Sequence, residues 1–217
     1  MIKRLFITLV DKLAQSNLRV LIGKGLVAGM SATPLFKTNH NEDLSLKHSF
    51  TKTDLEQCSD GLLFGKGNAQ LPASPLLMLD RIRDIQNTGG DFERGYAKAE
   101  LDIHPSDWFF APHFKGDPVM PGCLLIESMW QLTGFYLAWA GYSGKGRVLE
   151  SGRTKFVEPL QKQTAVLSIV VHVRKLLKGS MPICITDGTV EHAGNTLCSA
   201  TGIKIGLVDG EPHDRNM

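Results

Sequence analysis

A base and an acid of the kinds used in proton transfer lie fourteen positions apart in the chain, at His113 and Glu127. The segment DWFFAPHFKGD surrounds His113 with aromatic residues, and an apolar environment keeps an imidazole neutral and able to accept a proton near pH 7. Glu127 is the one formal charge between Pro121 and Ala140, so its carboxyl should be paired, hydrogen-bonded or protonated with a raised pKa. Gln131, one helical turn later, is a natural hydrogen-bond partner for it.

The start of the same segment could hold a developing negative charge. Pro121 suits the first turn of a helix, and the unpaired amides of Gly122 and Cys123 would then point outward with the positive end of the helix dipole. Glycine has no side chain to obstruct a carbonyl oxygen that approaches the backbone, as polarising a thioester would require. A base, a buried acid and an oxyanion site suit removal of a proton α to a carbonyl with departure of a β-hydroxyl.

Each of these features also has an ordinary structural explanation. His113 could be a hydrogen-bonded core histidine, Glu127 could face a water pocket or a subunit contact, and the Pro-Gly pair could form a common turn. The histidines and cysteines show none of the spacings of common zinc sites, so no metal is predicted. Four cysteines without a disulfide pattern predict free thiols and an intracellular, cytoplasmic protein.

One helix and a series of strands would position these residues. The run from Pro121 to Ala140 is apolar on nearly every side, which is typical of a helix buried in a domain core. Glu127, Gln131 and the strand-rich surroundings argue against a membrane span. Strand-forming runs bounded by turn residues cover 75–85, 97–103, 147–157, 164–177, 182–191 and 196–208. The sequence therefore predicts an α+β domain with a long antiparallel sheet curled around one central helix.

Two shorter signals complete this picture. The tetrad TGGD at 88–91 should turn the first strand back on the second as a hairpin. Thr53 followed by Glu56 resembles a capping box at the start of a short helix.

The first 45 residues differ from the rest of the chain. The whole chain has the composition of a globular protein and a net charge of +2. This charge gives no electrostatic case for nucleic-acid binding. Apolar residues recur at helical spacing from Ile2 to Leu13, and a breaker-rich linker follows. The extension could be an organelle-targeting segment, a membrane-surface helix, a helix docked on the domain, or the product of an upstream start codon with true initiation near Met30. Residues 46–217 are expected to form the domain.

The run HFKGDPVMPGCLLIESMWQLTGFYLAW resembles the active-site loop and central helix of the bacterial 3-hydroxydecanoyl-acyl-carrier-protein dehydratase/isomerase family. The resemblance extends through LFGKGNAQLPASPLLMLDRI, TGGDFERGYAKAELDI and DWFF upstream and through GKGR, KF, DG and KIGL downstream, over roughly residues 48 to 208. It implies a hot-dog fold and a homodimer whose two active sites lie at the subunit interface. His113 matches the catalytic histidine, Gly122 matches the glycine whose amide binds the thioester carbonyl, and Cys123 follows it in the same motif.

The resemblance also implies a reaction and a partner. A 3-hydroxyacyl chain on acyl carrier protein would be dehydrated to the trans-2-enoyl thioester without a cofactor, and isomerisation to the cis-3 form could follow. Glu127 stands where this branch usually has aspartate, and glutamate is typical of the sister branch that only dehydrates. Arg174, Lys175 and Lys178 are candidates for docking the acidic carrier protein. The alternatives are a non-catalytic hot-dog module that binds acyl thioesters or assembles with another subunit, and an acyl thioesterase.

Overall fold

The computed structural model describes residues 44–208, so the predicted amphipathic segment and the linker up to residue 43 lie outside the described residues. Within these residues the helices are α3 (Lys52–Ser59) and α4 (Gly122–Trp139). The strands are β1 (Arg81–Gln86), β2 (Tyr96–Ile103), β3 (Lys145–Glu150), β4 (Thr154–Phe156), β5 (Ala165–Leu177), β6 (Ile183–His192) and β7 (Asn195–Val208).

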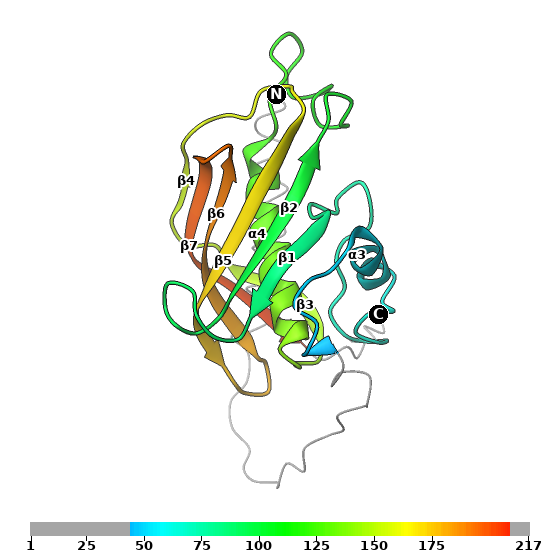
Figure 1. Cartoon of the computed structure of the whole chain (residues 1–217), viewed down its shortest axis with the longest axis vertical. Coiled ribbons are helices and arrows are strands. Elements are labelled where there is room, and N and C mark those ends of the chain that lie inside the picture. The colour runs from blue at the N-terminus through cyan, green and yellow to red at the C-terminus, as the bar shows by residue number, and fades with distance from the viewer. Residues whose placement is uncertain (1–43, 209–217) are drawn as a thin grey trace, which may run out of the picture.

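The strands form one antiparallel sheet in the order β1-β2-β5-β6-β7-β3, and β4 also pairs with β7. Burial alternates along β5, where Ala165, Leu167, Ile169, Val171 and Val173 face inward. Register shifts interrupt the β5–β6 and β6–β7 ladders, and such bulges increase the local bend and twist of a strand. The sheet therefore has one apolar face and curls around the helix that covers it (Figure 1).

Helix α4 runs along the inner face of this sheet and supplies the centre of the core (Figure 1). Met129, Leu132 and Leu137 are fully buried, and the hydroxyl of Thr133 pairs with that of Thr186 on β6 at 2.9 Å. Among residues 44–208 no helix is long and apolar enough to span a bilayer. The predicted α+β hot-dog architecture, with its central apolar helix, is confirmed.

Two predicted strands differ in extent from those in the structure. The segment predicted as strand 75–85 pairs only from Arg81 onward, because Gln131 of α4 hydrogen-bonds the backbone of Leu76 and Met78. The strand predicted over 147–157 is divided into β3 and β4. Their common partner β7 has a bulge at 201–202, between the segments that pair with each of them. Tertiary contacts, rather than local propensity, set both boundaries.

The predicted capping box at Thr53 and Glu56 was placed two residues late. Thr51 is the N-cap of α3 and exchanges hydrogen bonds with Asp54. The hairpin predicted at TGGD is confirmed, because the loop containing it joins the paired strands β1 and β2.

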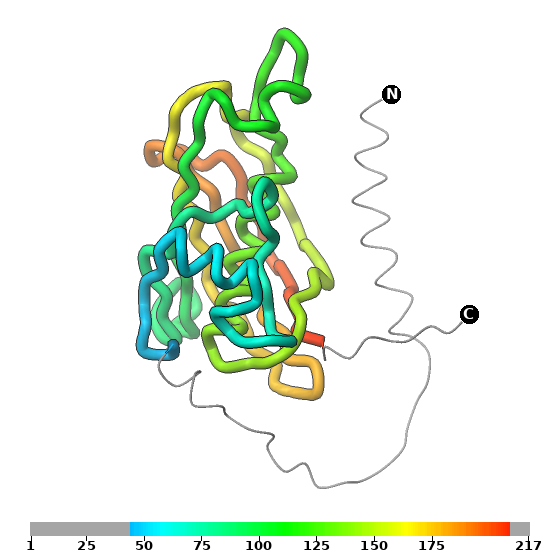
Figure 2. The backbone as a smooth tube through the Cα atoms, turned by 90° about the vertical axis from the view of Figure 1, so that its right-hand side faces the viewer, coloured from blue at the N-terminus to red at the C-terminus, as the bar shows by residue number. Residues whose placement is uncertain are grey.

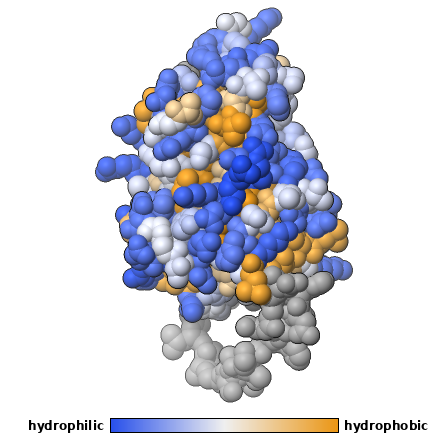
Figure 3. All heavy atoms as spheres, in the orientation of Figure 1, coloured by the Kyte–Doolittle hydropathy of each residue, from blue (hydrophilic) through white to orange (hydrophobic). Residues whose placement is uncertain are grey.

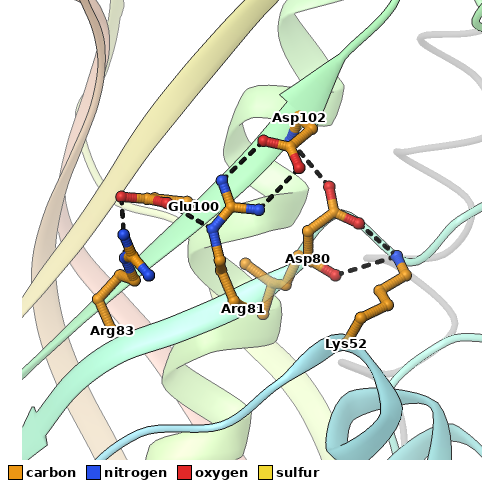
Figure 4. A network of polar contacts seen from close by, with 7 residues as sticks. Lys52, Asp80, Arg81, Arg83, Glu100 and Asp102 are labelled. Atoms are coloured by element: carbon orange, nitrogen blue, oxygen red, sulfur yellow. Dashed lines mark hydrogen bonds and ion pairs between the residues drawn. The ribbon is translucent and has the colours of Figure 1, made fainter.

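A network of ion pairs attaches α3 to the outer face of the sheet (Figure 4). Lys52 of α3 pairs with Asp80 at 2.6 Å. Beside it, Arg81 of β1 binds Asp102 and Glu100 of β2, and these carboxylates hold the pKa of the Arg81 guanidinium above its ordinary value. Hydrophilic side chains predominate on this side of the molecule, with only small separate apolar patches (Figure 3). This face of the sheet is therefore a solvated surface rather than part of the core.

Candidate active site

The loop that carries His113 connects β2 to α4 and projects at the end of the molecule where α4 begins (Figures 1 and 2). The backbone of His113 accepts a hydrogen bond from the Val119 N–H at 2.8 Å, and its ring Nδ1 lies 2.9 Å from the Val119 carbonyl oxygen. A carbonyl only accepts, so Nδ1 must carry the proton in this contact. In the neutral ring the lone pair then lies on Nε2, which is the arrangement that a general base requires.

This histidine lines a cavity of about 760 Å³ that is walled mainly by apolar side chains. The wall includes Leu125 of α4, Phe156 of β4, and Val157 and Leu160 from the segment that follows β4. A cavity of this size and character suits an extended apolar ligand. Within residues 44–208 no group hydrogen-bonds His113 Nε2, and this ring lies beside an apolar space.

The N-terminus of α4 opens onto the same cavity. Gly122 and Cys123 line it, Pro121 is the N-cap, and neither a side-chain cap nor an acidic residue neutralises the first turn. The positive end of the helix dipole therefore faces this cavity, and Pro121 precedes the first helical residue instead of occupying it. Burial raises the pKa of the Cys123 thiol, so this side chain stays protonated and is not an activated nucleophile.

Glu127 lies farther along α4 and faces a second, smaller cavity of about 150 Å³. Gln131 donates from Nε2 to Glu127 Oε1 at 3.0 Å and to the Leu76 carbonyl at 2.8 Å, and it accepts from the Met78 N–H at 2.9 Å. Burial raises the pKa of the Glu127 carboxyl, and the Gln131 contact opposes this only in part. The predicted i,i+4 hydrogen bond between Glu127 and Gln131 is present.

The cavities divide the predicted residues into two groups. His113, Gly122 and Cys123 line the larger one, while Glu127 and Gln131 line the smaller one. Gln131 is only 5% exposed and its amide is fully engaged with the protein, which suits a positioning residue rather than a substrate-binding one. One chain therefore holds the base and the acid in separate places.

The predicted docking residues lie far from His113 within the chain. Arg174, Lys175 and Lys178 stand at the end of β5, and the turn that follows is at the opposite end of the molecule from the His113 loop (Figures 1 and 2). Arg174 pairs with Asp187 at 3.0 Å and lies over a phenyl ring, so part of its charge is already engaged. Lys175 and Lys178 are exposed.

Sequence reasoning missed Phe156 and Val157, which line the larger cavity and are 55% and 53% exposed. The ring of Phe156 packs so closely on Gly122 that a Cβ at that position would lie 2.7 Å from Cε1. Their adjacency in the sequence could have revealed them. In a strand with one buried face apolar and polar positions alternate, so two consecutive apolar residues place one apolar side chain on the exposed face.

Comparison with known proteins identifies the class to which this fold and site belong. The sequence model of the FabA-like domain family matches residues 71–201, more than half of the chain, and the chain therefore belongs to this family.

Several solved structures are similar to this chain at low sequence identity. The dehydratase heterocomplex ApeI:P from Xenorhabdus doucetiae is 18% identical over 66% of this chain and 89% of that one, with a TM-score of 0.46. A hypothetical thioesterase with coenzyme A from Streptococcus pneumoniae TIGR4 is 16% identical over 60% and 87%, with a TM-score of 0.44. Thioesterase HI1161 from Haemophilus influenzae is 9% identical over 61% and 82%, with a TM-score of 0.41.

Proposed function

We propose that this protein, as a homodimer, dehydrates 3-hydroxyacyl chains carried on acyl carrier protein to trans-2-enoyl thioesters. The proposal rests on one observation. His113, whose Nδ1 contact leaves Nε2 as the basic nitrogen, and the N-terminus of α4, which has no side-chain cap, line the same apolar cavity. A thioester placed there would present its carbonyl oxygen to the amides and its C2 proton to the base.

The elimination balances with these groups alone. His113 Nε2 takes the C2 proton, the C2–H electron pair becomes the C2=C3 bond, and the C3–O bond breaks. The Gly122 amide stabilises the negative charge that develops on the carbonyl oxygen. Protonated Glu127 gives its proton to the departing hydroxyl, which leaves as water. No electrons are gained or lost, so the reaction needs no redox cofactor.

The direction of the Glu127 pKa supports its role as the acid. A carboxyl whose pKa is raised by burial keeps its proton closer to neutral pH, as a general acid must. In a thioesterase the same side chain would act as a carboxylate that activates water, and burial disfavours that form. Elimination is therefore better supported than hydrolysis.

A second copy of the chain would complete the site. In the part of the chain that the structure describes, strand β3 is an edge of the sheet with one side unpaired. Val148 on this strand is 37% exposed, as apolar side chains often are at subunit contacts. Antiparallel pairing of two such edges turns the second copy end for end. It would bring the His113 loop of one chain toward Glu127 of the other, and the basic end of β5 toward the partner's larger cavity.

This arrangement gives Lys175 and Lys178 a function that they lack in one chain. An acidic carrier protein bound at the basic end of one copy would deliver its thioester to the cavity of the other. Arg174 contributes less, because Asp187 already engages it.

A second step, trans-2 to cis-3 isomerisation, belongs to the same proposal. His113 would relay a proton from C4 to C2. Glutamate is longer by one methylene than the aspartate typical of the isomerising branch, and an ångström of misplacement strongly changes a rate. We propose dehydration as the principal activity. If an E127D variant gains cis-3 product, the length of this side chain decides whether isomerisation follows dehydration.

The test uses the purified full chain and a 3-hydroxyacyl thioester of acyl carrier protein. Enoyl absorbance should rise with the wild type and fall to background with H113A and E127Q, while circular dichroism shows both variants folded. Equal rates in the wild type and H113A would defeat the proposal and favour a binding module. Release of free thiol without enoyl product would favour the thioesterase.

A further inference from the structure

The phenyl ring of Phe114 lies against the imidazole ring of His113. The two ring centroids are 3.9 Å apart and the ring planes differ by 30°. In an edge contact such as that between Phe50 and Phe135 the planes differ by 73°. The rings of Phe114 and His113 are therefore stacked face to face, with the centroids closer than the separation of about 4.5–7 Å that is usual for aromatic pairs.

The loop backbone holds the Phe114 ring in this place. The Phe114 N–H donates to the Asp117 carbonyl at 2.9 Å, and the Asp117 N–H donates to the Phe114 carbonyl at 3.1 Å. Phe109 and Phe110 of the same loop are 3% and 2% exposed and belong to the core, whereas Phe114 is 40% exposed and lines the larger cavity with His113. Core packing therefore does not explain the position of Phe114.

In the proposed reaction His113 gains a proton in a cavity whose walls are mainly apolar, and such walls disfavour the imidazolium. Its Nδ1 faces a neutral carbonyl, and within residues 44–208 the one histidine with an ion-pair contact is His172. The titratable side chains around His113 are those of Cys123 and Glu158, which line the cavity, and those of Lys115 and Asp117 in its own loop. In the proposed dimer Glu127 of the second copy also approaches, but burial favours the neutral form of this carboxyl.

The face of an aromatic ring offers what these groups do not. It carries partial negative charge and attracts a cation that lies within about 6 Å of its centroid. The His113 ring lies well within this distance of Phe114. The stack also restricts rotation of the imidazole about its single contact with Val119.

We propose that Phe114 is a positioning residue whose ring face orients the imidazole of His113 and stabilises the imidazolium that forms when His113 takes the C2 proton. The inference rests on the proposed function, because only a histidine that accepts a proton needs this support. It adds to that function a residue that acts through the base rather than on the substrate.

The first test compares F114L and F114Y with the wild type in the enoyl assay. A cation–π contact at a partly exposed site contributes a factor of about two to five, so F114L should lose that much in kcat. The acidic limb of its kcat/KM profile should move to lower pH by about 0.5 pH unit, because the free imidazole then protonates less readily. F114Y keeps the ring face and is the matched control, with wild-type kcat and pH profile. An unchanged profile in F114L, a shift to higher pH, or a raised KM with kcat intact would overturn the inference.

A second test changes the electrons of the ring and leaves its shape. Phenylalanines that carry one, two and three fluorine atoms, incorporated at position 114, should lower kcat stepwise, and equal kcat across this series would contradict the inference. Proton NMR titration of the His113 ring in the wild type and F114L separates this outcome from failure of the proposed function. Turnover by the wild type with identical titrations defeats the inference alone. A wild type without turnover defeats the proposed function, and the stack is then supported if His113 protonates at higher pH in the wild type than in F114L and refuted if it does not.

Discussion

Replacing Gly122 with alanine should separate catalysis from stability at the start of α4. A Cβ at this position would lie 2.7 Å from Cε1 and 2.9 Å from Cδ1 of Phe156. To restore an ordinary contact of 3.4 Å the ring must move by about 0.7 Å. Phe156 is 55% exposed, so the ring can swing toward solvent, and the free energy of unfolding should fall by no more than about 1 kcal/mol.

The effect on turnover should be much larger. The methyl group would stand where the thioester oxygen has to approach the first amides of the helix, and loss of one oxyanion donor typically costs a factor of about 10² to 10³ in kcat. We expect G122A to lose that much in kcat with little change in KM for the carrier-bound substrate, because the apolar walls that bind the chain are intact.

The assay measures enoyl formation and thermal unfolding for G122A, F156A and the double variant. If the methyl itself blocks the oxygen, removing the ring in the double variant relieves the crowding but leaves kcat low. If kcat recovers, displacement of the ring caused the loss. Full activity in G122A would refute the assignment of the carbonyl to this helix terminus, and a loss of more than about 2 kcal/mol in stability would show a structural defect.

Three further predictions concern other parts of the molecule. Because the folded-state pKa of Glu127 is raised, its contribution to stability is complete below about pH 4.3 and declines as pH rises through the folded pKa, so urea titrations should show this decline in the wild type and not in E127Q. G188A should lower the free energy of unfolding by about 1–3 kcal/mol, measured in urea, because its Cβ would lie 2.8 Å from the Met129 sulfur in the core. Reversing the charge of Lys175 and Lys178 together should raise KM for the carrier-bound substrate, more at low salt than at high salt, while KM for a thioester of a small uncharged thiol stays unchanged.

The elements that could be predicted from the sequence are those whose burial requires a regular order of apolar and polar residues. Helix α4 is apolar on most sides because it is enclosed by the sheet, and the inward positions of β5 alternate because that strand has one core face. The predicted strands included residues near 75–80 and 151–153 that are not in strands. At both places residues distant in the sequence determine the backbone conformation. Gln131 hydrogen-bonds the backbone of the first segment, and the bulge in β7 interrupts the pairing of the second. The residues of these segments themselves carry no pattern that predicts either feature.

Part of the candidate site could also be proposed from the sequence. His113 and Glu127 stood out because each is a polar group in apolar surroundings, and the structure adds the Val119 contact that fixes the histidine tautomer. Trp130 did not stand out, because an indole on an apolar helix is expected in a core. The structure shows that no group within residues 44–208 accepts from its N–H.

The raised pKa of Glu127 also bears on how the proposed reaction returns to its starting state. After elimination, His113 holds the proton taken from C2 and Glu127 has lost one, so the next turnover needs a net proton transfer from the imidazolium to the carboxylate. An ordinary carboxylate is a weaker base than an imidazole, so in water this proton transfer costs free energy. Each unit by which burial raises the pKa of Glu127 removes about 1.4 kcal/mol of that cost. The apolar surroundings that keep the acid protonated before the reaction therefore also make its reprotonation less costly afterward.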